Sequence, residues 1–182
     1  MRKLICLPLV LLAMASMGSP ASARDWYVSK ARGKGKKGTK VKPSKDLGNI
    51  IKKLQPGDVV HIAEGTYTGR GDSGSNLILM PVSIIAGYSD DFSKRDPWGA
   101  HRTIFGGDNL SKNYTSKPSL MIDLAKYTGP NKPVLVDGVI VDMGFRNRYT
   151  TKEQTKLAPL ANPKTGENPC PSQGGLVVRC GK

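Results

Sequence analysis

The stretch QPGDVVHIAEGTY at residues 55–67 carries the signals that decide the fold. A Pro-Gly turn is followed at residues 59–63 by a run rich in β-branched side chains that alternates with period 2. In a strand that points Val60 and Ile62 inward, His61 points outward. Another glycine comes soon after the run, so the stretch predicts a short, half-buried strand between tight turns.

The residues just before this stretch predict a short amphipathic helix. Apolar side chains within residues 47–54 recur at i, i+3, i+4 and i+7 and form one stripe, with Lys52 and Lys53 outside it. Asp46 immediately precedes them and suits the N-cap position. The stripe consists of Leu47, Ile50, Ile51 and Leu54.

Further apolar runs follow at intervals that shorten along the chain. Runs that start at residues 59, 82, 103, 120 and 134 lie 23, 21, 17 and 14 residues apart, with glycine or proline turns between them. This spacing favours a solenoid in which each coil adds short strands to parallel sheets. A β-sandwich also tolerates several short strands at regular spacing and stays an alternative.

The composition fits one turn-rich β domain. The chain has 182 residues, with 28 Lys and Arg against 14 Asp and Glu, and with 21 Gly and 13 Pro. This length excludes two large domains, and the share of glycine and proline disfavours a helical bundle. Because 38% of the residues are hydrophobic, the chain also has more apolar material than a disordered polyelectrolyte.

The first residues predict export. Arg2 and Lys3 form a basic region, residues 4–15 are twelve apolar positions, and the Ala-Ser-Ala triplet at 21–23 is a small-residue cleavage site. Twelve helical residues span about 18 Å, short of the ~30 Å hydrocarbon core, which disfavours an uncleaved anchor. We expect residues 1–23 to be a signal peptide. The mature protein is then secreted, periplasmic or at the cell surface, with no transmembrane segment.

Export also changes the expectation for cysteine. Cys170 and Cys180 are the thiols that follow the signal peptide, and an oxidising compartment favours a disulfide between them. Pro171 and the glycine pair at 174–175 allow the chain to turn back far enough for such a bridge. Two unpaired thiols are the alternative.

Positive charge is concentrated near the start of the mature chain. Residues 24–53 hold eleven basic side chains against Asp25 and Asp46, a net charge of +9. Clustered lysines attract phosphate, sulfate or uronate groups through a salt-sensitive field. The loop at 31–45 is therefore either a solvated loop or a binding site for an anionic polysaccharide or cell-surface polymer. The lysines of that site would be Lys34, Lys36, Lys37, Lys40 and Lys42.

The same loop contains GKGKKG at residues 33–38, which matches the letters of the dinucleotide-binding fingerprint. That fingerprint needs a helix directly after its glycines, and here residues 39–43 intervene without a helical pattern. We therefore expect no nucleotide cofactor. Specific nucleic-acid binding is also disfavoured, because aromatic side chains for base stacking are scarce beside the lysines.

The sequence shows no catalytic constellation. Asp137 and Asp142 are an odd number of positions apart, so on one strand they would face opposite sides. The adjacent Asp90 and Asp91 would diverge for the same reason. Neither pair makes a convincing metal cluster, and the two histidines have no partner that the sequence identifies. The catalytic residues, if there are any, stay unknown, and we expect no metal.

Short motifs occur in a fixed order along the mature chain. They are WYVS at 26–29, the basic loop, the predicted helix, QPGDVV at 55–60, EGTY at 64–67, AGYSDDFSKRDP at 86–97, TIFGGD at 103–108, VDGVIV at 136–141 and GGLVV at 174–178. This order resembles the N-terminal cap and first coils of secreted right-handed parallel β-helix proteins of the pectin-lyase-like superfamily. The nearest resemblance is to bacterial surface proteins that begin with a domain of unknown function.

The resemblance implies an all-β fold in residues 24–182, an incomplete right-handed parallel β-helix with a short N-terminal capping α-helix. Residues 146–173 would be a loop or insertion, and the charges at Asp91, Arg95 and Asp96 would belong to a surface loop. The implied function is that of an exported, non-catalytic module that binds carbohydrate or another surface polymer. Polysaccharide lyases share this starting pattern but carry their catalytic groups on later coils, so a lyase or a truncated remnant of one is the alternative.

Overall fold

The computed structural model describes residues 23–69, 75–106, 118–142 and 175–180. Within these ranges the chain forms short strands and two single turns of 3-10 helix. The elements are β1 (Asp25–Val28), η1 (Leu47–Asn49), η2 (Ile51–Lys53), β2 (Val59–Ala63), β3 (Gly65–Tyr67), β4 (Asn76–Ile78), β5 (Ser83–Tyr88), β6 (Thr103–Phe105), β7 (Leu120–Asp123), β8 (Val136–Asp137), β9 (Val139–Val141) and β10 (Leu176–Arg179).

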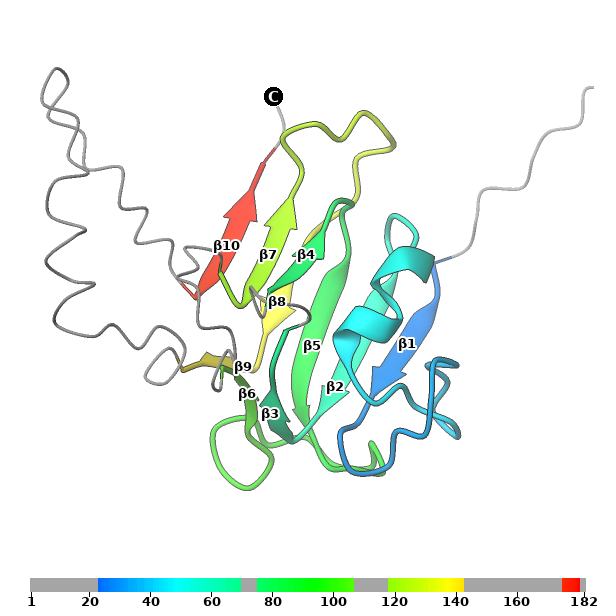
Figure 1. Cartoon of the computed structure of the whole chain (residues 1–182), viewed down its shortest axis with the longest axis vertical. Coiled ribbons are helices and arrows are strands. Elements are labelled where there is room, and N and C mark those ends of the chain that lie inside the picture. The colour runs from blue at the N-terminus through cyan, green and yellow to red at the C-terminus, as the bar shows by residue number, and fades with distance from the viewer. Residues whose placement is uncertain (1–22, 70–74, 107–117, 143–174, 181–182) are drawn as a thin grey trace, which may run out of the picture.

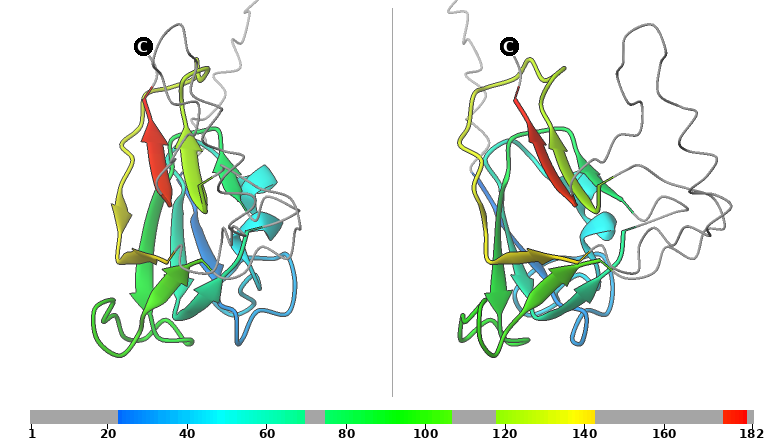
Figure 2. Two further views of the ribbon diagram at one scale, coloured as in Figure 1. Left: turned by 60° about the vertical axis from the view of Figure 1, so that its left-hand side comes forward. Right: turned by 90° about the vertical axis from the view of Figure 1, so that its left-hand side faces the viewer.

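The strands form three parallel sheets, which confirms an all-β fold. The sheet orders are β1-β2-β5-β8, β3-β6-β9 and β4-β7-β10. Each strand from β2 to β7 therefore pairs with the strand three places later in the chain (Figures 1 and 2). Every ladder between these strands is parallel, so the described residues do not form an antiparallel β-sandwich.

The register places apolar side chains on top of one another between neighbouring strands. Val60 and Ile62 are both fully buried while His61 is partly exposed, as the alternation in the sequence predicts. In the last strands the corresponding positions are less covered, and Val178 is 44% exposed. Removing these side chains from water is the main force that holds the strands together. The buried pairs in register include Val60 with Ile84, Tyr67 with Phe105, and Ile78 with Ile122.

The predicted helix has the expected apolar stripe but not the expected geometry. Leu47, Ile50 and Leu54 are buried in the same cluster as the strands' apolar residues, and the Asp46 carboxylate accepts a hydrogen bond from Asn49 N at 3.0 Å. The α-helix prediction is wrong, because the backbone makes two 3-10 turns instead. The segment is short, contains a glycine and is soon followed by a proline, which disfavours a continuous α-helix. Its backbone groups therefore form the tighter i→i+3 hydrogen bonds of a 3-10 helix.

The apolar run at 134–141 is also divided differently from the prediction. Gly138 has φ of +71° and separates β8 from β9, which belong to different sheets. A Cβ at this position would lie 2.4 Å from Ala86 O, so the close approach of the backbone requires glycine. Asp137 and Asp142 therefore do not share one strand, and the prediction that they face its opposite sides is wrong.

One buried carboxylate links the Pro-Gly-Asp turn to β1. Asp58 is 1% exposed, and its oxygens accept hydrogen bonds from Gln55 N at 2.8 Å and Arg24 N at 2.9 Å. The indole Nε1 of Trp26 also donates to this carboxylate, at 2.7 Å. Hydrogen bonds to an ionised acceptor are the strong ones. The Pro-Gly-Asp turn therefore both precedes β2 and connects it to β1 through the Asp58 carboxylate.

Some predictions fall on residues that the structure does not describe. These are the signal peptide apart from Ala23, the loop or insertion at 146–173, and Cys170. In the described ranges, no helix is long and apolar enough to span a membrane.

Candidate functional site

The loop that follows β1 carries the predicted lysines and lies along the free edge of that strand. We call residues 29–45 the lysine loop. Tyr27 N donates to Gly38 O at 2.9 Å, and Ser44 N donates to Tyr27 O at 2.8 Å. Ser29 N donates to Ser44 O at 2.9 Å. A bare strand edge would present unpaired backbone groups, and the lysine loop satisfies those of β1 while being held in place by them.

Packing requires glycine at one position of the GKGKKG motif and leaves space at another. Gly38 has φ of +68°, and a Cβ there would lie 2.6 Å from the Trp26 ring. At Gly35, by contrast, a Cβ would meet nothing within 4 Å. The first helical turn after the GKGKKG motif is η1, well beyond its last glycine. No helix therefore begins directly after the glycines, as the dinucleotide fingerprint would need.

Four of the five predicted lysines line one pocket, which has a volume of about 780 Å³. Lys40 does not line it. All the charged side chains in its wall are basic, so their fields add and the pocket attracts anions. The Nζ of Lys53 also lies close by, donating to Lys36 O at 2.5 Å. We call this the lysine pocket, and its wall consists of Ala31, Arg32, Lys34, Gly35, Lys36, Lys37, Val41, Lys42 and Pro43.

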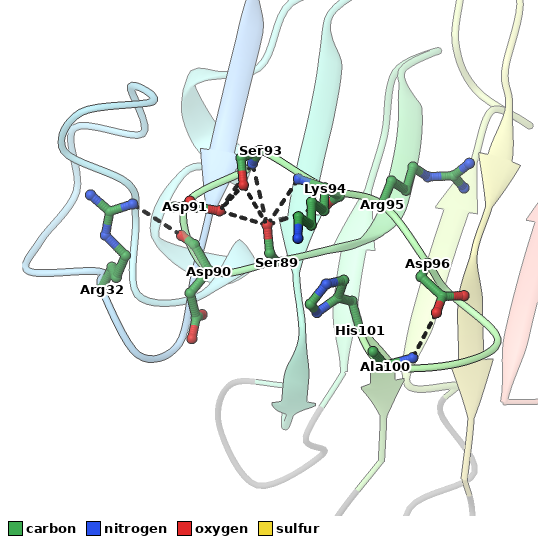
Figure 3. Close-up of a pocket in the computed structure, with 10 residues that line it drawn as sticks. All are labelled: Arg32, Ser89, Asp90, Asp91, Ser93, Lys94, Arg95, Asp96, Ala100 and His101. Atoms are coloured by element: carbon green, nitrogen blue, oxygen red, sulfur yellow. Dashed lines mark hydrogen bonds between the residues drawn. The ribbon is translucent and has the colours of Figure 1, made fainter.

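A second pocket, of about 1230 Å³, lies beside the loop after β5 (Figure 3). We call it the 89–101 pocket. Because β1 and β5 run parallel in one sheet, the loops that follow them leave the sheet at the same end (Figure 1). Arg32 contributes to the walls of both pockets. The 89–101 pocket is lined by Arg32, Ser89, Asp90, Asp91, Ser93, Lys94, Arg95, Asp96, Ala100 and His101.

Two of the three carboxylates of the 89–101 pocket, those of Asp91 and Asp96, are used in the loop's own turns. Ser89 Oγ and Ser93 Oγ donate to Asp91 Oδ1 at 2.6 and 2.7 Å, and these bonds hold the pKa of Asp91 well below its usual range. Asp96 accepts from Gly99 N at 3.0 Å and Ala100 N at 2.9 Å. These two side chains therefore have turn-forming roles, as the resemblance implied for a surface loop.

The charges of this second pocket balance, unlike those of the lysine pocket. Asp90, Asp91 and Asp96 oppose three cationic side chains in the wall, so the formal charge is zero with His101 neutral. Arg95 is further neutralised by Asp137, with Nη2 and Oδ2 2.6 Å apart. A polyanion would consequently gain little by entering the 89–101 pocket, and the lysine pocket is the stronger candidate for one.

Both histidines have partners that the sequence did not identify. His61 lies between two side chains, with Nε2 3.0 Å from Asp25 Oδ1 and Nδ1 3.2 Å from Tyr88 Oη. Its ring also stacks on Tyr27, with centroids 4.9 Å apart. Burial, followed by the charge of Asp25, raises the pKa of the Tyr27 phenol. His101 Nδ1 lies 3.0 Å from a Glu64 carboxylate oxygen.

Parallel pairing brings these histidine partners together, since Tyr27 and His61 are directly opposite in register. The contacts join residues 27 to 37 positions apart in the chain. A sequence motif has no local signal for pairs at that separation. The register of the sheets, and not a local motif, therefore decides which side chains meet the histidines.

The described residues contain no metal-binding cluster and one cysteine. No group of three or more His, Cys, Asp or Glu side chains in those ranges could hold a metal ion. Cys180 is exposed and carries no disulfide in the structure. Because Cys170 lies outside the described residues, the bridge between them stays a prediction.

Comparison with known proteins yields no relative, because no family model, no curated protein and no solved structure matches the chain.

Proposed function

We propose that the protein is an exported, non-catalytic module of the parallel β-helix type that binds an anionic carbohydrate or another anionic surface polymer. The order of motifs resembles the first coils of the pectin-lyase-like superfamily. The pairing of each strand from β2 to β7 with the strand three places later is the pattern that successive three-strand coils would produce. The signal-peptide pattern of residues 1–23 supports a secreted, periplasmic or cell-surface location.

The observation that carries the binding proposal is the lysine pocket. Arg32 and four lysines converge in its wall without an acidic side chain. Lysine is a point charge on a flexible stem, suited to sulfate, phosphate or carboxylate groups spaced along a polymer. Exposed charges act through a field that salt screens, so the binding should be strong at low ionic strength and weaken steeply as salt rises.

A salt series with immobilised heparin and polygalacturonate tests this proposal. The Lys36→Ala/Lys37→Ala variant removes two charges from the lysine pocket and is expected to weaken binding about tenfold, with a shallower dependence on salt, as ion-release arguments predict for lost cation contacts. The measurement is the dissociation constant at several salt concentrations.

The matched control is Lys126→Ala/Lys132→Ala, which removes the same charge from two exposed lysines outside both pockets. It is expected to change the dissociation constant less than twofold, a difference of roughly 0.4 kcal/mol. Binding that is absent or insensitive to salt would overturn the proposal. Equal weakening by both variants would do the same, because it would show that net charge and not the pocket attracts the polymer.

A polysaccharide lyase, or a remnant of one, is the second candidate. It is favoured by the contacts of His61 with Asp25 and Tyr88, which we call the His61 row. A histidine oriented by a carboxylate and placed beside a phenol hydroxyl is an arrangement able to transfer protons. Incubation with polygalacturonate and alginate in the presence of calcium tests it by the absorbance of unsaturated products. If the row is catalytic, His61→Ala abolishes a measurable rate. If the protein is the proposed non-catalytic binding module, neither the parent protein nor His61→Ala forms product.

A further inference from the structure

We propose that the buried carboxylate of Asp58 is the binding site for the α-ammonium group that signal-peptide removal creates at Arg24. The inference rests on the export part of the proposed function, and it goes beyond that function by assigning a binding site and a role to the new terminus. Its basis is the contact between Arg24 N and Asp58 Oδ1, at 2.9 Å.

Residue 24 is held on several sides in the described fold. Its carbonyl oxygen accepts a hydrogen bond from Val59 N at 2.9 Å, which continues the ladder between β1 and β2. Its guanidinium lies 4.2 Å from the centre of the Trp26 ring, within the range of a cation–π contact. The backbone nitrogen is therefore fixed beside the carboxylate, and it does not reach Asp58 by chance fluctuation of a loose end.

The expected cleavage site coincides with this fixed nitrogen. The Ala-Ser-Ala triplet at 21–23 predicts that Arg24 is the first residue of the mature chain. Before cleavage its nitrogen is a neutral amide with one hydrogen. Hydrolysis of the bond between Ala23 and Arg24 consumes one water, leaves a carboxylate on the leader and places an ammonium on Arg24.

An ammonium is a better partner than an amide for this carboxylate. Asp58 is 1% exposed, so little water screens its charge. The groups that donate to it, Gln55 N and Trp26 Nε1, are both neutral. A positively charged donor converts the third contact into an ion pair with a hydrogen bond, which adds the attraction between two opposite charges to the existing bond. Removal of the leader should therefore tighten the junction between β1 and β2.

The charged groups near the new ammonium define its pH dependence. They are Asp58 from the turn before β2, the guanidinium of Arg24 itself, and Asp25, which is engaged with His61. A carboxylate at hydrogen-bond distance raises the pKa of an ammonium above its unfolded value of about 7.7–8.0. The added stability is then fully present below that value and is lost as pH rises through the raised pKa.

The test compares two secreted products of the full gene. One has the natural leader, and the other has Gly-Ser inserted after Ala23, which leaves the mature chain two residues longer and Arg24 N as an amide. Mass spectrometry establishes each N-terminus, and thermal unfolding is recorded from pH 6 to pH 11. The natural product is expected to melt about 3–6 °C higher at pH 6–7, and this difference should disappear at the alkaline end.

Two further measurements keep the outcomes distinct. Asp58→Asn in both products should erase the difference in melting temperature. If that variant does not fold, the acylation rate of the α-amine is used instead, and it should be several-fold slower in the natural product at pH 7–8. Equal melting temperatures at every pH would overturn the ammonium site. A natural product that does not begin at Arg24 would overturn the processing site, and neither result bears on polymer binding by the lysine pocket.

Discussion

The Asp58→Ala variant is expected to lose about 3–5 kcal/mol of unfolding free energy, a large share of the roughly 5–15 kcal/mol typical of a domain. Alanine offers no acceptor to the indole N–H of Trp26, a side chain that is 3% exposed. The backbone nitrogens of Arg24 and Gln55 lose their acceptor as well. A buried donor left without a partner carries its full desolvation cost. Urea unfolding followed by circular dichroism measures the loss.

The control for this prediction is Asp123→Ala. Asp123 faces Arg179 in an exposed ion pair with a 3.4 Å contact and also accepts a hydrogen bond from Ala125 N. Exposed pairs contribute about 0–1 kcal/mol, so this variant should stay within about 1 kcal/mol of the parent protein. If Asp58→Ala were equally mild, water would be taking the place of the carboxylate, and the proposed fastening of β1 to β2 through Asp58 would be incorrect.

The Gly38→Ala variant is expected to lose about 2–4 kcal/mol and to weaken binding of anionic polymers. Its φ of +68° is unfavourable for alanine, at a cost of about 1–2 kcal/mol. The added Cβ would also lie 2.6 Å from the Trp26 ring, and overpacking of this kind costs about 1–3 kcal/mol more. Relief requires the backbone at Gly38 to move away from β1, which displaces the lysines next to it. Thermal unfolding and heparin affinity report the two effects.

Gly35→Ala is the matched control, since it adds the same methyl group to the same loop where a Cβ meets nothing within 4 Å. It is expected to change stability by less than about 1 kcal/mol. The contrast isolates the geometry of Gly38. Similar losses in both variants would mean that the loop tolerates no substitution at all, contrary to the packing described for it.

Some elements could be predicted because their signals are local. The alternation at residues 59–63 places Val60 and Ile62 inside and His61 outside, and the structure agrees. The apolar stripe that starts at Leu47 is likewise buried. The α-helix predicted for this segment was wrong, because an α-helix and consecutive 3-10 turns both bring residues three apart to one side, so the stripe does not distinguish them.

The sites show a similar division. The clustered lysines are visible in the sequence, and four of the five predicted ones line one pocket. The neutral balance of the 89–101 pocket was not predictable, because Arg32 comes from a different loop than the other residues of its wall. The single run at 134–141 gave no sign that Gly138 would divide it between two sheets.

The amino-acid sequence by itself determined the β-rich character, the position of the strand at 59–63 and the concentration of positive charge, because side-chain alternation, turn residues and charge runs act over a few neighbouring residues. The spacing of the apolar runs left a parallel solenoid and a β-sandwich open, and tertiary structure decided for parallel sheets. It also decided that His61 meets Asp25 and Tyr88, and that Asp58 receives Arg24 and Trp26. These pairings join residues 27 to 36 positions apart. The register of packed strands selects such partners, and no local pattern encodes it.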